Sequence, residues 1–319
     1  LHLSIRRQRQ MCIRDRVKPG AKHKKSNALL NVMIAISAIA MIGALGLIAY
    51  PTFSDWWNRM HQSYAVAGYV EQTKDMSGAE RKAMLKAAHE YNERLAANGD
   101  RWHMTDAQKR EYDETLDVTG TGIMGYVTIP RIKVKLPVYH GTSDGVLQIA
   151  AGHLAGTSLP VGGATTHAVV SGHTGLPSAR LLTGLDELQK GDTFAFHVLD
   201  ETYTYQVDQI SVVLPSEISK LNIESGADYA TLITCTPYGV NSHRLLVRGH
   251  RIPNPKVPDK TQYDEPGEMT AVAAAVIGLL VFVAGCAFVG LARLWRRSWI
   301  VRHGLCAGAG ARHSSGVRG

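Results

Sequence analysis

The sequence predicts a mainly β domain, folded as a closed barrel or a sandwich, with helices before it and a membrane-spanning helix at each end. Three observations support this fold class. Seven short β-like segments, separated by Gly, Pro, Asp and Ser turns, occur within residues 124–251. Helical periodicity precedes them in residues 53–97. Two uncharged apolar runs, 29–50 and 269–292, flank the whole region.

The chain opens with a basic stretch, residues 1–28, which we expect to be a cytoplasmic tail. Position 1 is not Met, and residues 1–20 resemble translated sequencing-adapter sequence more than a protein segment. We therefore expect residues 1–20 to be an artefact and leave them out of the fold prediction.

Each apolar run is long enough to cross a hydrocarbon layer of about 30 Å as a helix that rises about 1.5 Å per residue. Lysines precede 29–50, and arginines follow 269–292 in the C-terminal tail, 293–319. The positive-inside rule then places both termini in the cytoplasm and the region between the runs outside. A cleaved signal peptide is the alternative for 29–50, but the run exceeds a typical signal core and no clean small-x-small cleavage motif follows it.

The net charge of +8 belongs to the ends of the chain. Residues 51–269 hold 20 Lys and Arg against 26 Asp and Glu, a net charge of −6. Nucleic-acid binding needs a basic face on the folded part, so we expect a membrane and no nucleic acid as partner.

Two helices are predicted within residues 51–99. Aromatic and aliphatic side chains favour the first over 53–72, and a Ser77-x-x-Glu80 capping box begins the second, which ends at Asn98-Gly99. Residues 100–122 are polar and irregular, and loop-length statistics favour a flexible linker over a functional flap.

The region 123–253 is predicted to hold the strands, at 124–129, 132–139, 166–171, 193–199, 202–214, 229–234 and 245–251. Short helices are expected at 146–151 and 179–188. Residues 254–268, rich in proline, are predicted to tether this domain to the second apolar run.

Cys235 is the candidate nucleophile. Cys12 and Cys306 fall in the tails and Cys286 in the second apolar run, which leaves one thiol without a disulfide partner in the external region. Such a cysteine is either a buried hydrophobic residue or a reactive group. Its position at a strand end, in Thr-Cys-Thr-Pro, favours the reactive group. No ligand spacing suggests a metal site, and no cofactor is expected.

A thiolate needs a base or a nearby positive charge. Among ten histidines of the external region, His173 is favoured because it follows an apolar strand that ends in Gly172, and His243 is the rival because it adjoins Arg244. Arg244 has the donors to bind an oxyanion. A Cys, His and Arg set indicates acyl transfer.

At these residues the sequence resembles the sortase family. Thr231, Leu232, Thr234 and Cys235 fit its TLxTC signature, Arg244 fits the family arginine, and 171–173 fit the family histidine. Residues 125–130, 136–142, 152–160 and 235–239 resemble the class C, pilin-polymerising members, and the resemblance covers about residues 60–255.

The resemblance implies a closed eight-stranded β-barrel with a thiolate–imidazolium pair at Cys235 and His173, and with Arg244 at the oxyanion. It implies that a pilin or surface protein with an LPxTG-like sorting signal is cleaved through a thioester and joined to the lysine amine of another pilin. The second apolar run agrees with class C, because housekeeping sortases usually have only the N-terminal anchor.

Class C sortases also carry a lid with an Asp-Pro-aromatic tip. Asp100, Arg101 and Trp102 stand at that place, with Arg101 where the family has proline, and they favour a lid over a linker for 100–122. We expect Asp100 to pair with Arg244, Trp102 to shield Cys235, and the loss of proline to make the tip more flexible.

Two other functions remain open on the sequence. One is a housekeeping sortase that anchors surface proteins to peptidoglycan, and the other is a non-enzymatic pilus scaffold in which Cys235 is structural. The accepting amine distinguishes the first from pilin polymerisation, and the behaviour of a Cys235→Ala variant distinguishes the second.

Overall fold

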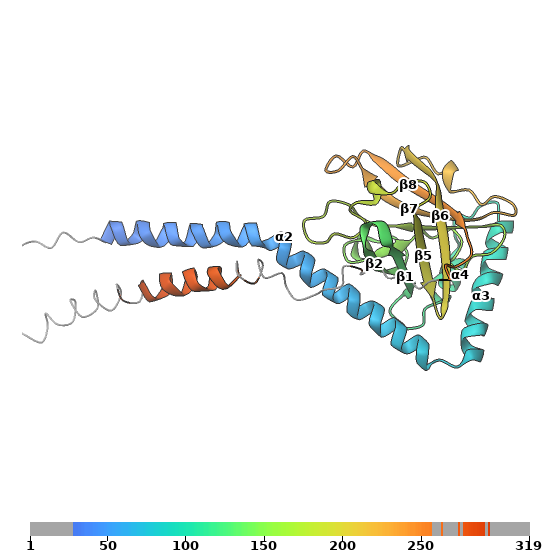
Figure 1. Cartoon of the computed structure of the whole chain (residues 1–319), viewed down its shortest axis with the longest axis horizontal. Helices are drawn as coiled ribbons and strands as arrows, with labels where there is room; N and C mark the ends of the chain where they lie inside the picture. The colour runs from blue at the N-terminus through green and yellow to red at the C-terminus, as the bar shows by residue number, and fades with distance from the viewer. Residues whose placement is uncertain (1–27, 257–262, 264–273, 275–276, 291–292, 294–319) are drawn as a thin grey trace, which may run out of the picture. The chain divides into compact units, whose positions relative to one another are not determined.

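A computed structural model describes residues 28–256, 263, 274, 277–290 and 293 (Figure 1). The chain divides into two compact units, Leu47–Gly278 and a terminal unit made of Leu1–Gly46 and Leu279–Gly319. The predicted tails and most of the predicted tether lie outside the described residues.

Helix α2 (Ala28–Asp75) begins in the terminal unit, where its apolar side chains are exposed. Leu29, for example, is 75% exposed and Ile39 68%. Among the described residues, α2 contains the one helical stretch, Val32–Asp75, that is long and apolar enough to cross a membrane. A surface of this kind is stable in lipid but not in water.

The second predicted span is described only in part. Helix Ile277–Gly290 is apolar but shorter than the roughly 20 residues that a membrane crossing requires. The remaining positions of the run 269–292 lie mostly outside the described residues, so the structure does not show a second crossing.

The unit Leu47–Gly278 contains a closed barrel of eight strands, as the sequence predicts. The strands are β1 (Ile123–Ile129), β2 (Val134–His140), β3 (Ala151–His153), β4 (Thr166–Ser171), β5 (Thr193–Val198), β6 (Glu201–Val213), β7 (Asp228–Thr236) and β8 (His243–Arg251). Their order around the barrel is β1-β2-β3-β4-β7-β8-β6-β5, and β5 pairs with β1. The pairs β2–β3 and β4–β7 are parallel and the others antiparallel.

The strand pattern of the sequence locates seven of these strands to within two residues. The eighth strand, β3, has three residues and was not predicted. It begins at Ala151, the last residue of the helix predicted at 146–151. In that region only the shorter helix α5 (Asp144–Leu147) forms. The helix predicted at 179–188 is wrong. Leu181 and Gly184 have positive φ angles of 44° and 93°, which a helix excludes, and only the 3-10 turn η2 (Leu185–Glu187) forms.

The remaining connections contain two further 3-10 turns. These are η1 (Pro130–Ile132), between β1 and β2, and η3 (Ser219–Leu221), in the connection between β6 and β7. Leu221 is buried at the end of η3, which anchors that connection to the domain.

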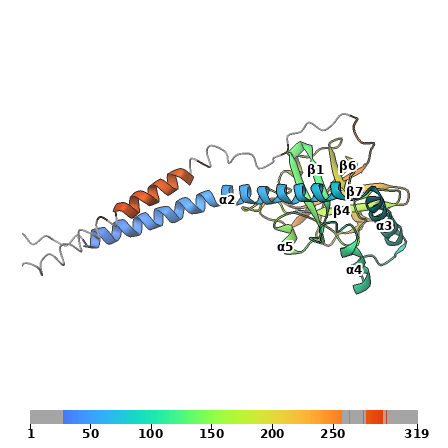
Figure 2. The same ribbon diagram turned by 90° about the horizontal axis from the view of Figure 1, so that it is seen from below.

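Two helices lie on the outside of the barrel (Figure 2). The helix predicted at 53–72 is not separate from the run 29–50, because α2 continues through Pro51. The second half of α2 is attached through buried Tyr69, whose hydroxyl donates to Met124 O and accepts from Leu199 N. Helix α3 (Gly78–Ala97) begins with the predicted Ser77–Glu80 capping box.

The segment 100–122 is not an irregular loop. It contains helix α4 (Asp106–Glu114), which Thr105 caps with Gln108 in a second capping box. The sequence pattern concealed this helix because only one of its nine residues, Tyr112, is buried. The Tyr112 hydroxyl lies 3.0 Å from His153 Nδ1 and accepts from Gly141 N, so α4 is fixed to the barrel.

Candidate active site

Strand polarity brings three predicted residues to one edge of the barrel. Strands β4 and β7 are parallel, so the chain leaves both at the same edge, where Gly172 N donates to Ile233 O. His173 follows Gly172, and Cys235 lies near the end of β7. Strand β8 is antiparallel to β7, which pairs Arg244, near its start, with Cys235.

The other residues of the TLxTC pattern support the strand that carries the thiol. Leu232 is fully buried in the main core, and Thr231 lies 2.7 Å from the buried ring of His167. Thr234 is 3% exposed, and its hydroxyl donates to Gly172 O at 2.8 Å. Thr234 therefore joins the end of β7 to the residue before His173.

Gly172 is required by close packing behind His173. A Cβ atom at this position would lie 2.8 Å from Cγ of Leu182, which is fully buried. Leu182 N also donates to His173 O, so Leu182 holds the backbone of His173 as well as packing against Gly172.

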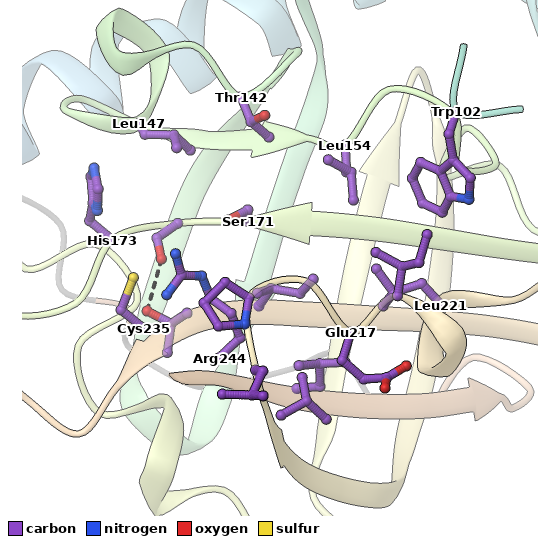
Figure 3. A pocket seen from close by; sticks show the side chains of 18 residues that line it. Trp102, Thr142, Leu147, Leu154, Ser171, His173, Glu217, Leu221, Cys235 and Arg244 are labelled. Atoms are coloured by element: carbon purple, nitrogen blue, oxygen red, sulfur yellow. Dashed lines mark hydrogen bonds between the residues drawn. The ribbon is translucent and has the colours of Figure 1, made fainter. Parts of the chain in front are cut away.

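The three residues line one pocket of about 410 Å³. Figure 3 shows Cys235, His173 and Arg244 gathered at one end of it, and Trp102, Leu154 and Leu221 at the other. Most other lining residues are apolar and come from β4, β6, β7, β8 and the connection 214–227 between β6 and β7. A groove of this kind suits an extended peptide with apolar side chains.

The three side chains are accessible to solvent. Cys235, His173 and Arg244 are each partly exposed. Within the described part of the chain, no hydrogen bond joins the His173 ring to the Cys235 sulfur, and catalytic contacts often form only when a substrate binds. Arg244 donates to the carbonyls of Asn241 and His243 through Nη1 alone.

The rival histidine, His243, does not line this pocket. It pairs with Thr236 across β7 and β8, one residue beyond the Cys235–Arg244 pair, and its Nδ1 lies 2.9 Å from the Ser242 hydroxyl. The geometry therefore favours His173.

The contacts expected of the lid tip are wrong in two respects. Asp100 does not reach Arg244; its carboxylate contacts the ring of His103 instead, at 2.7 Å. Trp102 lines the pocket but lies at the end away from Cys235 (Figure 3), in a cluster with Leu154 and Leu221.

The more flexible tip stays a prediction, and the structure shows which contacts Arg101 makes in place of proline. Arg101 is only 8% exposed, and its guanidinium donates to Gly156 O at 3.1 Å, Leu221 O at 3.0 Å and Asn222 Oδ1 at 3.3 Å. It also lies over the Trp102 ring, 4.5 Å from the centroid. The arginine anchors this segment through its side chain instead of fixing its backbone as proline would.

Two buried histidines outside the pocket lining, His153 and His167, have a lowered pKa. The pKa of His167 is lowered to about 4, mainly by burial and also by the nearby charges of Arg248 and Arg101. Its Nδ1 must carry the proton that is donated to Asn222 O, so its Nε2 accepts from the Thr231 hydroxyl. Burial likewise lowers the pKa of His153 to about 4.

Sequence reasoning missed the contribution of the connection 214–227 and of His167. The connection supplies Leu214, Pro215, Glu217, Ile218 and Leu221 to the pocket. No sequence pattern pointed to these residues, because only the fold brings them beside strands β4 and β7.

Known proteins resemble the barrel closely. The model of the Sortase domain family matches residues 127–252. The crystal structure of sortase C1 from Streptococcus agalactiae is 51% identical, covers 60% of this chain and all of its own, and has a TM-score of 0.59. The structure of sortase C from Streptococcus pneumoniae, which gives insight into catalysis and pilin substrate specificity, is 45% identical over 60% of this chain and 97% of its own, with a TM-score of 0.54.

A third structure is sortase C of Clostridium perfringens with the C-terminal cell wall sorting motif. It is 40% identical, covers 60% of this chain and all of its own, and has a TM-score of 0.54. Curated relatives, which are sortases A, are 27 to 30% identical. The chain spans about half, 47%, of the length of the first of them.

Proposed function

This chain belongs to the sortase family, and we propose that it is a membrane-anchored cysteine transpeptidase of the pilin-polymerising class C. The observation that carries the proposal is the meeting of Cys235, His173 and Arg244 at one end of an apolar pocket. A thiol, an imidazole and a guanidinium are the groups that acyl transfer through a thioester requires.

The proposed reaction has two steps. The Cys235 thiolate attacks the threonine carbonyl of an LPxTG-like signal, Arg244 donates to the oxyanion, and protonated His173 gives its proton to the departing glycine amine. A lysine ε-amine of another pilin then attacks the thioester and loses a proton to His173, which leaves an isopeptide bond and frees the Cys235 thiolate. These steps need no redox agent and no metal.

The class C assignment is supported by the solved relatives. They are sortases C at 38 to 51% identity, whereas the curated sortases A match at 30% or less. The alternative of a housekeeping enzyme predicts a cell-wall amine as acceptor in place of a pilin lysine.

Membrane attachment is part of the proposal. Helix α2 provides the first span, and we propose that 269–292 provides a second, so that both tails lie in the cytoplasm and the barrel outside. The enzyme would then meet sorting signals and acceptor pilins at the outer surface of the cell membrane.

Intact-mass spectrometry tests the function directly. The full chain in detergent micelles is mixed with an LPxTG peptide, with Cys235→Ala as the matched control. We expect a thioester adduct on the wild type alone, and its transfer to a lysine peptide in preference to an oligoglycine amine. Preference for oligoglycine would support the housekeeping alternative. Absence of any adduct, together with full fibre assembly by Cys235→Ala in cells, would support the scaffold.

A further inference from the structure

Arg101 joins three segments that are distant in sequence. Its guanidinium connects residues 100–102 to the turn at Gly156, which follows β3, and to Leu221 and Asn222 in the middle of the connection 214–227. That connection supplies five side chains to the Cys235 pocket. The arginine therefore lies behind a pocket wall made of residues that are not otherwise adjacent in the chain.

The turn at Gly156 is shaped to accept this segment. Gly156 has a φ of +84°, and a Cβ atom there would lie 2.5 Å from Arg101 O and 3.2 Å from Cε3 of Trp102. Any other residue would both strain the backbone and displace residues 101–102. The close approach of the two backbones is thus a built contact.

The Trp102 ring is held on two sides. The Arg101 guanidinium covers it, and the ring packs with Leu154 and Leu221 against a buried apolar cluster. Stacking with a guanidinium and apolar burial both oppose rotation of the ring.

A chain of buried hydrogen bonds continues from this wall to the strand of the nucleophile. Asn222, which accepts from Arg101 through Oδ1, accepts from His167 Nδ1 through its carbonyl, at 2.8 Å. His167 Nε2 accepts from Thr231, four residues before Cys235 on β7. Each link has a donor and an acceptor, so the wall and β7 are held in one arrangement.

We propose that Arg101 is a positioning residue that fixes the width of the Cys235 pocket by locking Trp102 and the connection 214–227 into one rigid wall. Only the identity of the pocket's occupant, an extended peptide, rests on the proposed function. The wall is ready before the peptide binds, so its rigidity lowers the ordering cost of binding. The guanidinium covers Trp102, which lies at the end of the pocket away from Cys235 (Figure 3), so it acts on peptide affinity and not on the chemical step.

Kinetics of the full chain in detergent micelles, with an LPxTG peptide and a lysine peptide, test this role. Arg101→Met keeps the apolar stem but removes all donors, and we expect KM for the LPxTG peptide to rise about tenfold, equivalent to 1.4 kcal/mol. We expect kcat to change by less than about twofold, because Cys235, His173 and Arg244 are unaffected. Arg101→Lys keeps the positive charge but not the forked set of donors, so its KM for the LPxTG peptide should lie between those of the wild type and Arg101→Met.

Arg110→Met is the matched control, because Arg110 is an exposed arginine on α4 outside the pocket. It should leave both constants unchanged. An unchanged KM in Arg101→Met, or a fall in kcat alone, would overturn the inference.

Hydrogen exchange of the free protein gives a second test that needs no turnover. We expect the amides of 155–157 and 214–227 to exchange faster in Arg101→Met and in Gly156→Ala, but not in Arg110→Met. Unchanged exchange there, or a uniform increase over the whole barrel, would show that Arg101 has no positioning role. If the wild type forms no thioester, the proposed function fails, whereas the exchange result still decides for or against the wall.

Discussion

At the scale of single residues, strand β7 uses its two faces for different tasks. Leu232 enters the core of the barrel, while Ile233 and Cys235 lie on the other face and line the pocket. Side chains alternate along a strand, so a signature of adjacent residues describes both faces at once. Thr234 differs from these apolar neighbours because its buried hydroxyl donates a hydrogen bond to Gly172 O.

Thr234→Val is expected to slow thioester formation and to reduce the free energy of unfolding by about 1–3 kcal/mol, because Gly172 O loses its donor in a buried site. Adduct mass against time and chemical denaturation measure the two effects. Thr234→Ser keeps the hydroxyl and is the control. Equal behaviour of the two variants would contradict a positioning role for this hydrogen bond.

His153 and His167 predict a loss of stability in acid. Both have a pKa of about 4 when folded, below the ordinary 6.5, so the unfolded chain binds more protons between these values. Stability is complete above about pH 6.5 and falls below it by about 1.4 kcal/mol per pH unit for each histidine. Around His167 lie Arg101, Arg248 and Asp208, and near His153 lies His140.

Thermal unfolding between pH 7 and pH 5 measures this dependence. His167→Gln removes one titrating group and should flatten the fall in melting temperature, even though it lowers stability at pH 7. His250→Gln, at an exposed position, should leave the slope as it is. A slope that is the same in all three proteins would argue against buried neutral histidines.

At the scale of elements, the helices are attached by polar contacts to the barrel as well as by apolar packing. In α3, the Asn92 side chain donates to Leu159 O and accepts from Leu159 N. Leu159 lies in a buried segment between β3 and β4; its carbonyl also accepts from Val161 N, whereas its N–H has Asn92 as acceptor. Helix α4 uses Tyr112 in the same way, at Gly141 and His153.

Asn92→Leu should destabilise the domain by about 1–3 kcal/mol, because Leu159 N loses its acceptor in a buried site while Leu159 O keeps Val161 N as donor. Urea unfolding gives the change in free energy. Glu93→Gln, the neighbouring exposed position of α3, is the control and should lie within about 0.5 kcal/mol of the wild type. A small effect of Asn92→Leu would mean that water replaces the side chain.

At the scale of the whole molecule, charge and apolar surface are separated along the chain. The region 51–269 has a net charge of −6, whereas basic residues gather outside the apolar runs. Exposed apolar side chains cover the first half of α2. This separation is typical of a chain that crosses a membrane and carries its domain outside.

The native cysteines can test the proposed two-span topology. If 269–292 crosses the membrane, Cys306 lies in the cytoplasm and a membrane-impermeant maleimide should label it only after cell lysis. Cys235 should be labelled in intact cells and is the internal control, with peptide mapping to separate the sites. Labelling of Cys306 in intact cells would show that the second run does not cross as proposed.

Local sequence determined most of the strands, the start of α3 and the neighbourhood of Cys235 and Arg244. These depend on alternation, capping residues and pairing between adjacent strands, all of which act over short distances in the chain. Helix α4, with a single buried residue, gave no periodic signal, and β3 is too short to give one.

Only the tertiary structure decided what residues 100–102 contact. Arg101 finds its acceptors at Gly156 and at Leu221 and Asn222, which are 55 to 121 positions away in the chain. The resemblance placed the tip over Cys235, whereas Trp102 lies under the Arg101 guanidinium at the other end of the pocket (Figure 3). A charged side chain is buried only where several acceptors converge, and the convergence of distant backbone carbonyls is a property of the fold, not of any local pattern.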